Sequence, residues 1–332
     1  MWIRRASHIV AVAILLCYLA MPATLSAQAE TQSSLAEPTD RGPLLNINEY
    51  PLESIFLSWP LLDPEPVPRG RHEFTVGLVS SNFFRHDVGT EGEVYLDGES
   101  LRLNLGARYG LADRWDAELQ ISLIRYGGGV LDGPIRSFER FFGFPHRGPQ
   151  SGVNNQFRYS ITRDGDAVID RGGAYGGLGD TRILLRRSLG EAARFSYGAV
   201  AAVKLPTGQK GLGSGGVDAG LGVLGKYVEG RWRFRGEVDA ILMSDFEEIP
   251  ARNRMELKLG LEYVRGRLSL YLQTDFKGSA ITWGKRQLDK APGQATVGVK
   301  FAKPANVMHQ IFMIEDLTRT SPDITYGYAV EW

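Results

Sequence analysis

The sequence is poor in features that would place it in several common classes. Its 332 residues contain one cysteine, and 38 lysines and arginines balance 38 aspartates and glutamates. The balanced charge gives no reason to expect nucleic acid as a partner. No run reaches the roughly 18 apolar residues of a membrane-spanning helix. Glycine, in contrast, is abundant, since 40 glycines exceed the roughly 7% of an average protein.

The first 29 residues are predicted to form a secretory signal peptide. Two arginines precede a short apolar run over residues 9–20, and residues 27–29 have the small-x-small pattern of a signal-peptidase site. The alternative, a membrane anchor, disagrees with this short run, because a spanning helix needs about 20 residues. The single cysteine, Cys17, lies inside this leader. The mature chain would then contain no cysteine, which excludes disulfides, cysteine zinc sites and cysteine nucleophiles.

Apolar and polar residues alternate in many stretches after the leader. Residues 101–109 alternate leucine, alanine and tyrosine with arginine, asparagine and glycine. Residues 232–242 alternate in the same way with charged residues, and Ile241 is the one exception. A period of two is typical of β-strands with one apolar face.

Two kinds of β-protein fit this alternation, a soluble sandwich and an outer-membrane barrel. Strand length favours the barrel, because ten residues at about 3.3 Å each, tilted by about 40°, span roughly 25 Å of hydrocarbon. The connections alternate between very short, as at residues 110–114, and long, as at residues 126–179. Aromatic residues beside the short turns, such as Tyr109 and Trp115, would form an interfacial girdle.

We therefore predict an all-β fold, a transmembrane antiparallel up-and-down β-barrel of about 12 strands with short periplasmic turns and long extracellular loops. Closure is expected because an open sheet edge would leave backbone groups unpaired in hydrocarbon. The strands are expected near residues 72–83, 92–109, 115–126, 179–188, 194–205, 217–228, 231–243, 254–264, 267–277, 294–302, 308–317 and 323–332.

The last strand indicates how the chain reaches its membrane. Every second residue from Ile324 to Trp332 is apolar, which resembles the C-terminal signal that hands outer-membrane barrels to the insertion machinery. We expect this machinery, outer-membrane lipids and lipopolysaccharide as partners, and no nucleic acid. The predicted location is the cell outer membrane.

Residues 30–70 precede the barrel, which is predicted over residues 71–332. The part from residue 42 to residue 70 is rich in both proline and large apolar residues. Proline disfavours a central strand, and this much apolar surface is not expected to remain in water. We predict a plug inserted in the lumen, with a periplasmic docking segment or a disordered tether as alternatives.

The polar face of the predicted strands carries charges of both signs. A selective pore usually has one sign at its constriction, so the mixed set favours a structural network of ion pairs that fills a narrow lumen. The residues predicted to line the lumen are Arg102, Arg108, Asp116, Glu118, Arg182, Arg233, Arg235, Glu237, Asp239, Glu256, Lys258 and Glu262.

The long loop after the third strand has two features of its own. Residues 134–143 place four apolar residues on one helical face, which indicates a lid or a helix in the outer leaflet, with an ordinary loop as the alternative. Residues 155–170 are expected to extend the loop as a hairpin that turns at Asp164.

Catalytic, metal and cofactor sites have little support, and none is predicted. The histidines after the leader are His72, His86, His146 and His309, without an H-E-x-x-H motif. Ser80, Asn82 and His86 would lie near the outer rim, where outer-membrane phospholipases carry their site, but the histidine two residues before the serine is missing. The glycine-rich residues 207–213 precede a strand, so a phosphate loop is not expected.

Five stretches together resemble a bacterial outer-membrane family known only as domain-of-unknown-function family 3187. They are G-P-L-L-N-I-N-E-Y-P-L from Gly42, Y-L-D-G-E-S-L-R-L-N-L-G-A-R-Y-G-L at 95–111, V-L-D-G-P-I at 130, G-L-G-D at 177 and K-L-P-T-G at 204. The last two are also similar to barrels linked to the degradation of aromatic compounds. The resemblance implies an outer-membrane barrel and leaves its activity open.

The fold supplies a lumen and the sequence no catalytic constellation, so we expect non-enzymatic passage or binding of a small solute, with an apolar solute among the candidates. Two alternatives stay open. One is a lipid-modifying hydrolase at the outer rim, and the other is a non-conducting barrel that maintains the envelope.

Overall fold

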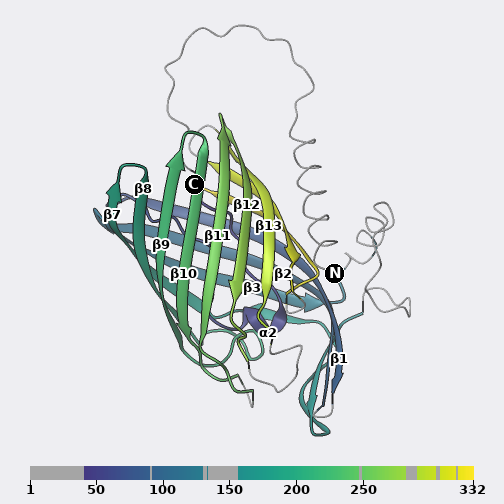
Figure 1. Cartoon of the computed structure of the whole chain (residues 1–332). Coiled ribbons are helices and arrows are strands. Elements are labelled where there is room, and N and C mark those ends of the chain that lie inside the picture. The colour runs from purple at the N-terminus through teal and green to yellow at the C-terminus, as the bar shows by residue number, and fades with distance from the viewer. Residues whose placement is uncertain are drawn as a thin grey trace.

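The computed structural model describes residues 41–89, 92–129, 133, 156–246, 249–281, 290–303, 307–318 and 321–332. Twelve antiparallel strands close into a tilted barrel, as the sequence predicts (Figure 1). They are β1 (His72–Gly89), β2 (Gly92–Ala112), β3 (Trp115–Gly127), β7 (Thr181–Ala192), β8 (Phe195–Leu205), β9 (Asp218–Glu229), β10 (Trp232–Leu242), β11 (Arg254–Arg265), β12 (Leu268–Lys277), β13 (Gly293–Ala302), β14 (Met308–Asp316) and β15 (Ile324–Glu331).

The seam of the barrel joins the first strand to the last. The β1 strand pairs with β15 from Thr75 opposite Glu331 to Asn82 opposite Ile324. Two backbone hydrogen bonds between Phe74 and Trp332, of 2.9 and 3.1 Å, continue this ladder to the end of the chain. The closed ring has no free edge to leave backbone groups unpaired in an apolar medium.

The two faces of the wall are the reverse of those of a soluble protein. On β10, Phe234 points outward and is 46% exposed, whereas the neighbouring Arg235 points inward and is 4% exposed. The strands β7, β9 and β11 repeat this alternation of exposed apolar and buried polar side chains. An apolar belt around a polar interior is the arrangement of barrels whose outer face meets lipid.

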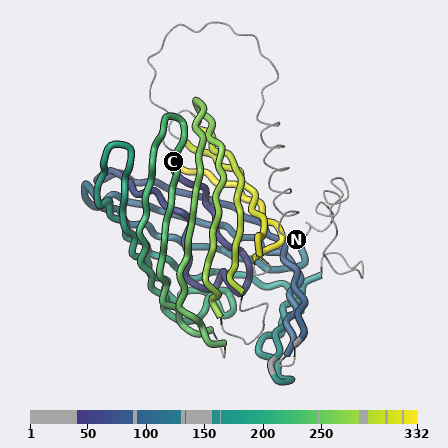
Figure 2. The backbone as a smooth tube through the Cα atoms, viewed as in Figure 1, coloured from purple at the N-terminus to yellow at the C-terminus, as the bar shows by residue number. Residues whose placement is uncertain are grey.

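Three further strands belong to the sheet. They are β4 (Arg158–Arg163), β5 (Asp166–Arg171) and β6 (Tyr175–Leu178). The β6 strand continues the ladder of β7 along β3, whereas β4 and β5 lie beyond the ring. The β4 strand pairs with the far part of β2, and β5 with β4 across a turn at Asp164, whose φ is 51°. The long β1 and β2 strands thus extend past the barrel as a small sheet, visible at the lower right of the backbone trace (Figure 2). The amphipathic stretch predicted at residues 134–143 lies outside the described residues.

The barrel has two unlike ends. At one end short turns join the strands, such as β9 to β10 and β11 to β12; at the other end lie the long connections and the β4–β5 hairpin (Figure 1). We call these the short-turn end and the long-loop end. Within the described residues, no helix is long and apolar enough to cross a membrane.

Candidate functional site

Residues 41–70, here called the N-terminal segment, run through the interior of the barrel and back. The segment starts at the short-turn end, where Arg41 donates a hydrogen bond to the carbonyl of Gly266. It reverses direction at the short helix α2 (Pro51–Ser54), which lies near the long-loop end. It then returns, and Gly70 donates a backbone hydrogen bond to Gly110 at the turn between β2 and β3. Its ends therefore lie at the same end of the barrel.

The outgoing part of the segment is hydrogen-bonded to inward-facing side chains of β12 to β14. The backbone N–H of Leu44 donates to Gln273 at 2.6 Å, and that of Leu45 donates to Gln310 at 2.8 Å. These polar wall side chains satisfy backbone groups that have no strand partner.

The returning part is held by carboxylates of the wall. Glu237 on β10 accepts from the indole N–H of Trp59 at 2.5 Å and from the backbone N–H of Leu62 at 2.8 Å. Asp218 accepts from the Leu57 N–H and Asp116 accepts from the Val67 N–H, each at 2.8 Å. Charged acceptors strengthen such bonds, so carboxylates of the wall, of which Glu237 and Asp116 were predicted to line the lumen, hold the segment in place.

The four carboxylates of the segment are each paired with a base of the wall. Glu49 lies 2.6 Å from Arg102, and Glu53 pairs with Arg254 on β11. The other pairs are Asp63 with Lys226 and Arg235, each at 3.0 Å, and Glu65 with Lys226 at 2.7 Å. Burial raises the pKa of Glu53, an effect that the neighbouring Arg254 opposes. The pairing is reciprocal, since wall and segment each supply both donors and acceptors.

Inward-facing glycines of the wall leave room for the segment. A β-carbon added to Gly260 would lie 2.6 Å from a methyl of Leu61, and one added to Gly298 would lie 2.7 Å from a methyl of Leu44. A β-carbon added to Gly220 would lie 2.8 Å from the ring of Trp59. Real β-carbons do not approach this closely, so larger residues there would displace the segment.

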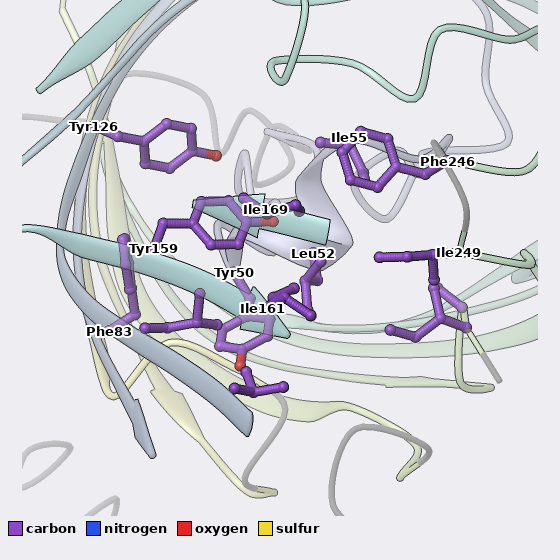
Figure 3. Packing of buried hydrophobic residues seen from close by; sticks show 14 of the residues in the cluster. Tyr50, Leu52, Ile55, Phe83, Tyr126, Tyr159, Ile161, Ile169, Phe246 and Ile249 are labelled. Carbon is purple, nitrogen blue, oxygen red and sulfur yellow. The ribbon is translucent and has the colours of Figure 1, made fainter. Parts of the chain in front are cut away.

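A cluster of buried apolar residues, here called the mouth cluster, covers the turn of the segment at the long-loop end. Tyr50, Leu52 and Ile55 of the segment pack there against side chains of the wall and of the outer sheet (Figure 3). Ser54 Oγ also lies 3.0 Å from the hydroxyl of Tyr126. The wall and sheet residues include Phe83, Tyr126, Tyr159, Ile161 and Ile169, and the connection between β10 and β11 adds Phe246 and Ile249.

The residues predicted to line the lumen face the interior of the barrel. Ten are buried or nearly so: Arg102, Asp116, Arg182, Arg233, Arg235, Glu237, Asp239, Glu256, Lys258 and Glu262. The other two, Arg108 and Glu118, form an ion pair of 3.2 Å nearer the short-turn end, where Arg108 is partly exposed. Lys258 is bonded to Glu237 and Asp239 and lies 4.6 Å over the ring of Trp59.

Several buried charged side chains of the lumen were not among those predicted. Lys204 is fully buried and lies 2.8 Å from Asp180 and 3.4 Å from Asp218. Arg186 makes two hydrogen bonds to Asp116. Lys204, Asp218 and Arg186 occupy polar positions of alternating strands, so the same period of two could have identified them.

A cavity of about 590 Å³ lies between the N-terminal segment and the wall formed by β1 to β3 and β7. Asn104, Gln120, Arg182 and Arg186 line it from the wall, and Leu45 and Leu61 line it from the segment. Its volume is in the range of small-ligand sites.

The structure does not bring together the residues considered for lipid hydrolysis. His86 lies 2.8 Å from Glu93, and its ring packs against Tyr95. Ser80 is six residues away on the same strand, about 20 Å at the usual rise. The glycine-rich loop after β8 is held by Asp180, which accepts a hydrogen bond from the N–H of Gly208 at 2.9 Å.

Comparisons with known proteins find a matching family and similar solved structures. The sequence model of the family described as "Protein of unknown function (DUF3187)" matches residues 16–332. The COG4313 outer membrane channel from Pseudomonas putida F1 is 18% identical with a TM-score of 0.55, over 81% of this chain and 97% of that one. The Ralstonia pickettii toluene transporter TbuX is 11% identical with a TM-score of 0.39, over 80% and 90% of the two chains. No curated protein matches. The likeness to the COG4313 channel supports the barrel fold.

Proposed function

Because this chain belongs to the DUF3187 family of proteins of unknown function, as its motifs predict, we propose its function from its own geometry. The protein is an outer-membrane barrel for the passage of a small solute, and the N-terminal segment is its plug. The observation that carries this proposal is the way the segment is attached. Its residues 44–67 form no strand, so it can leave the lumen while the hydrogen-bonded ladder of the wall stays intact.

The glycine positions support a resident plug. A wall whose inward residues were all large would exclude the segment, whereas Gly220, Gly260 and Gly298 each face one of its apolar side chains. The wall is therefore shaped for this occupant. Ion pairs and hydrogen bonds can exchange with water when the segment moves, so the contacts are suited to release.

The proposal includes the location and the partners of the barrel. The apolar outer wall would face the lipids of the outer membrane, including lipopolysaccharide. The last strand, ending at Trp332, would be the part that the insertion machinery binds. In the closed barrel the rings of Trp332 and Phe74 lie 6.0 Å apart at the seam.

A sealed barrel that only maintains the envelope is a second candidate. The dense pairing between the segment and the wall favours it, because release of the segment would break many buried ion pairs at once. The two functions differ in one measurable property, the conductance of the barrel with and without the segment.

Single-channel conductance in planar bilayers tests the proposal. The mature chain is compared with a chain that lacks residues 30–70, and folding of both is checked by heat-modifiable migration on a gel. We expect the truncated barrel to conduct and the full chain to stay largely closed. If neither conducts, the wall itself seals the lumen and the envelope role replaces passage.

A reversible lock provides a second test on the full-length protein. Leu61→Cys combined with Gly260→Cys places two thiols where the segment meets the wall, in a mature chain without other cysteines. We expect any spontaneous openings of the mature chain to disappear on oxidation and to return on reduction. Openings that persist in the oxidised protein would show that the segment does not control passage.

A further inference from the structure

The cavity beside the N-terminal segment is open towards the short-turn end. Its lining there includes Arg71, His72 and Trp332, which lie at the start of β1 and at the end of the chain. Deeper in the barrel the same cavity reaches Arg182 on β7. A small molecule that enters from the short-turn end would therefore meet Arg182 without displacing the segment.

Arg182 differs from the other basic residues around it because it has no acidic partner. It is 5% exposed, and among the described residues its guanidinium makes one hydrogen bond, from Nη2 to the carbonyl of Ser54 at 3.3 Å. Its buried Nε–H has no acceptor. Among the described residues, no carboxylate lies within ion-pair distance of its guanidinium. A buried cation in this state is costly, and an anion would relieve the cost.

The acidic residues nearest to Arg182 are committed to other bases. Asp180 and Asp218 both pair with Lys204, the residue opposite Arg182 on β8. Glu49 is bonded to Arg102 at 2.6 Å. These pairs leave the guanidinium facing a cavity instead of a carboxylate of the protein.

A second unused donor lines the same cavity. The buried Nδ2 of Asn104 on β2 has no hydrogen-bond partner. Leu45, Ile47 and Leu61 contribute apolar side chains from the segment on the opposite side. Two donors at the wall and an apolar surface across from them fit a molecule with one anionic end and a short apolar body.

We propose that this cavity binds a small organic monocarboxylate through Arg182, with Asn104 as a second donor and the segment covering the apolar part. A guanidinium and a carboxylate match in geometry and charge, and such bonds are the stronger kind in a protein interior. The inference rests on the proposed function in one respect, since it names the class of solute that would pass.

Equilibrium dialysis with radiolabelled hexanoate tests the site in the full mature chain, folded in a nonionic detergent, with protein-free micelles as the blank. Hexanamide, of the same size but uncharged, is the matched probe. We expect saturable binding of hexanoate at least about tenfold tighter than that of hexanamide, the usual effect of one charge-assisted hydrogen bond. Equal binding of the two probes, or no saturable binding of hexanoate, would overturn the inference.

Three variants assign the binding to Arg182. Arg182→Gln should weaken hexanoate at least about tenfold and leave hexanamide nearly unchanged, whereas Arg182→Lys should keep part of the preference because it keeps the charge. Arg233→Gln is the control, since Arg233 is an inward-facing arginine on β10 that does not line the cavity. Heat-modifiable migration confirms that each variant folds. An equal loss in the Arg233 variant would contradict a defined site.

The dialysis and the bilayer experiment can fail separately. Hexanoate binding by a barrel that never conducts would keep the site and refute passage. Conductance of the truncated barrel without hexanoate binding to the mature chain would keep passage and refute the site.

Discussion

The two sides of the barrel interior differ in how closely they contact the N-terminal segment. On the packed side, formed by β9 to β13, glycines receive its side chains, and Glu237 accepts two of its hydrogen bonds. On the open side, formed by β2, β3 and β7, Arg102 and Asp116 also bond to the segment, but the three atoms nearest to a β-carbon on Gly106 belong to the wall, and Arg182 lines a cavity. One side of the wall is built to hold the segment, and the other leaves space beside it.

This difference separates two roles that one polar lumen could have combined. Attachment depends on contacts that are closely fitted, while ligand binding needs space and groups that are left unpaired. Changes on the packed side should therefore alter stability and conductance. Changes on the open side should alter binding of small molecules with little effect on stability.

The largest expected effect comes from Glu237→Leu on the packed side. It leaves Trp59 and Leu62 without their acceptor and removes one partner of Lys258, so we expect a loss of about 3–5 kcal/mol in the free energy of unfolding. Urea unfolding followed by tryptophan fluorescence measures it. Glu118→Leu on the open side breaks a partly exposed pair and should cost about 1 kcal/mol or less. Equal costs would contradict the comparison.

An intermediate effect is expected when inward-facing glycines are replaced. Gly260→Leu places a side chain where Leu61 lies, and such overpacking should cost about 1–3 kcal/mol and increase the frequency of openings in bilayers. Gly106→Leu is the control, because its β-carbon would meet Thr75 and Glu118 at the ordinary distances of 3.4 and 3.5 Å. We expect this control to change stability by about 0.5 kcal/mol or less. A larger loss of stability at Gly106 than at Gly260 would refute the idea that Gly260 leaves room for Leu61 of the segment.

The smallest effect is expected at the turn of the segment and concerns pH. Burial raises the pKa of Glu53, so its contribution to stability is fully present below the ordinary carboxyl range and is lost as the pH rises through the folded value. The charged groups that act on it are Arg254, Lys277 and Glu256. Between pH 7 and pH 4 we expect the wild type to gain stability relative to Glu53→Gln in urea unfolding. The opposite slope would show that Arg254 outweighs burial.

The wall of the barrel could be predicted from the sequence because it obeys a local rule. Period-two alternation specifies which residues face lipid and which face the lumen, without knowledge of any partner. Even the exception has a physical cause. Ile241, the one apolar residue on the polar face of β10, packs in the cluster that contains Trp59.

The contacts of the segment could not be predicted in the same way. Its residues have no period, so nothing local indicates that Leu61 faces Gly260 or that Leu44 faces Gly298. The isolation of Arg182 is harder still to foresee, because it depends on which bases pair with Glu49, Asp180 and Asp218. The β6 strand was missed because it has only four residues, too few for a recognisable pattern.

The carboxylates of the segment have a consequence for ion selectivity. Residues 41–68 contain one basic residue, Arg41, and four acidic ones, a formal charge of three negative. A barrel from which they have withdrawn keeps the bases that paired with them, so its lumen becomes more positive by three charges. Withdrawal of the segment would therefore widen the lumen and also raise its permeability to anions relative to cations.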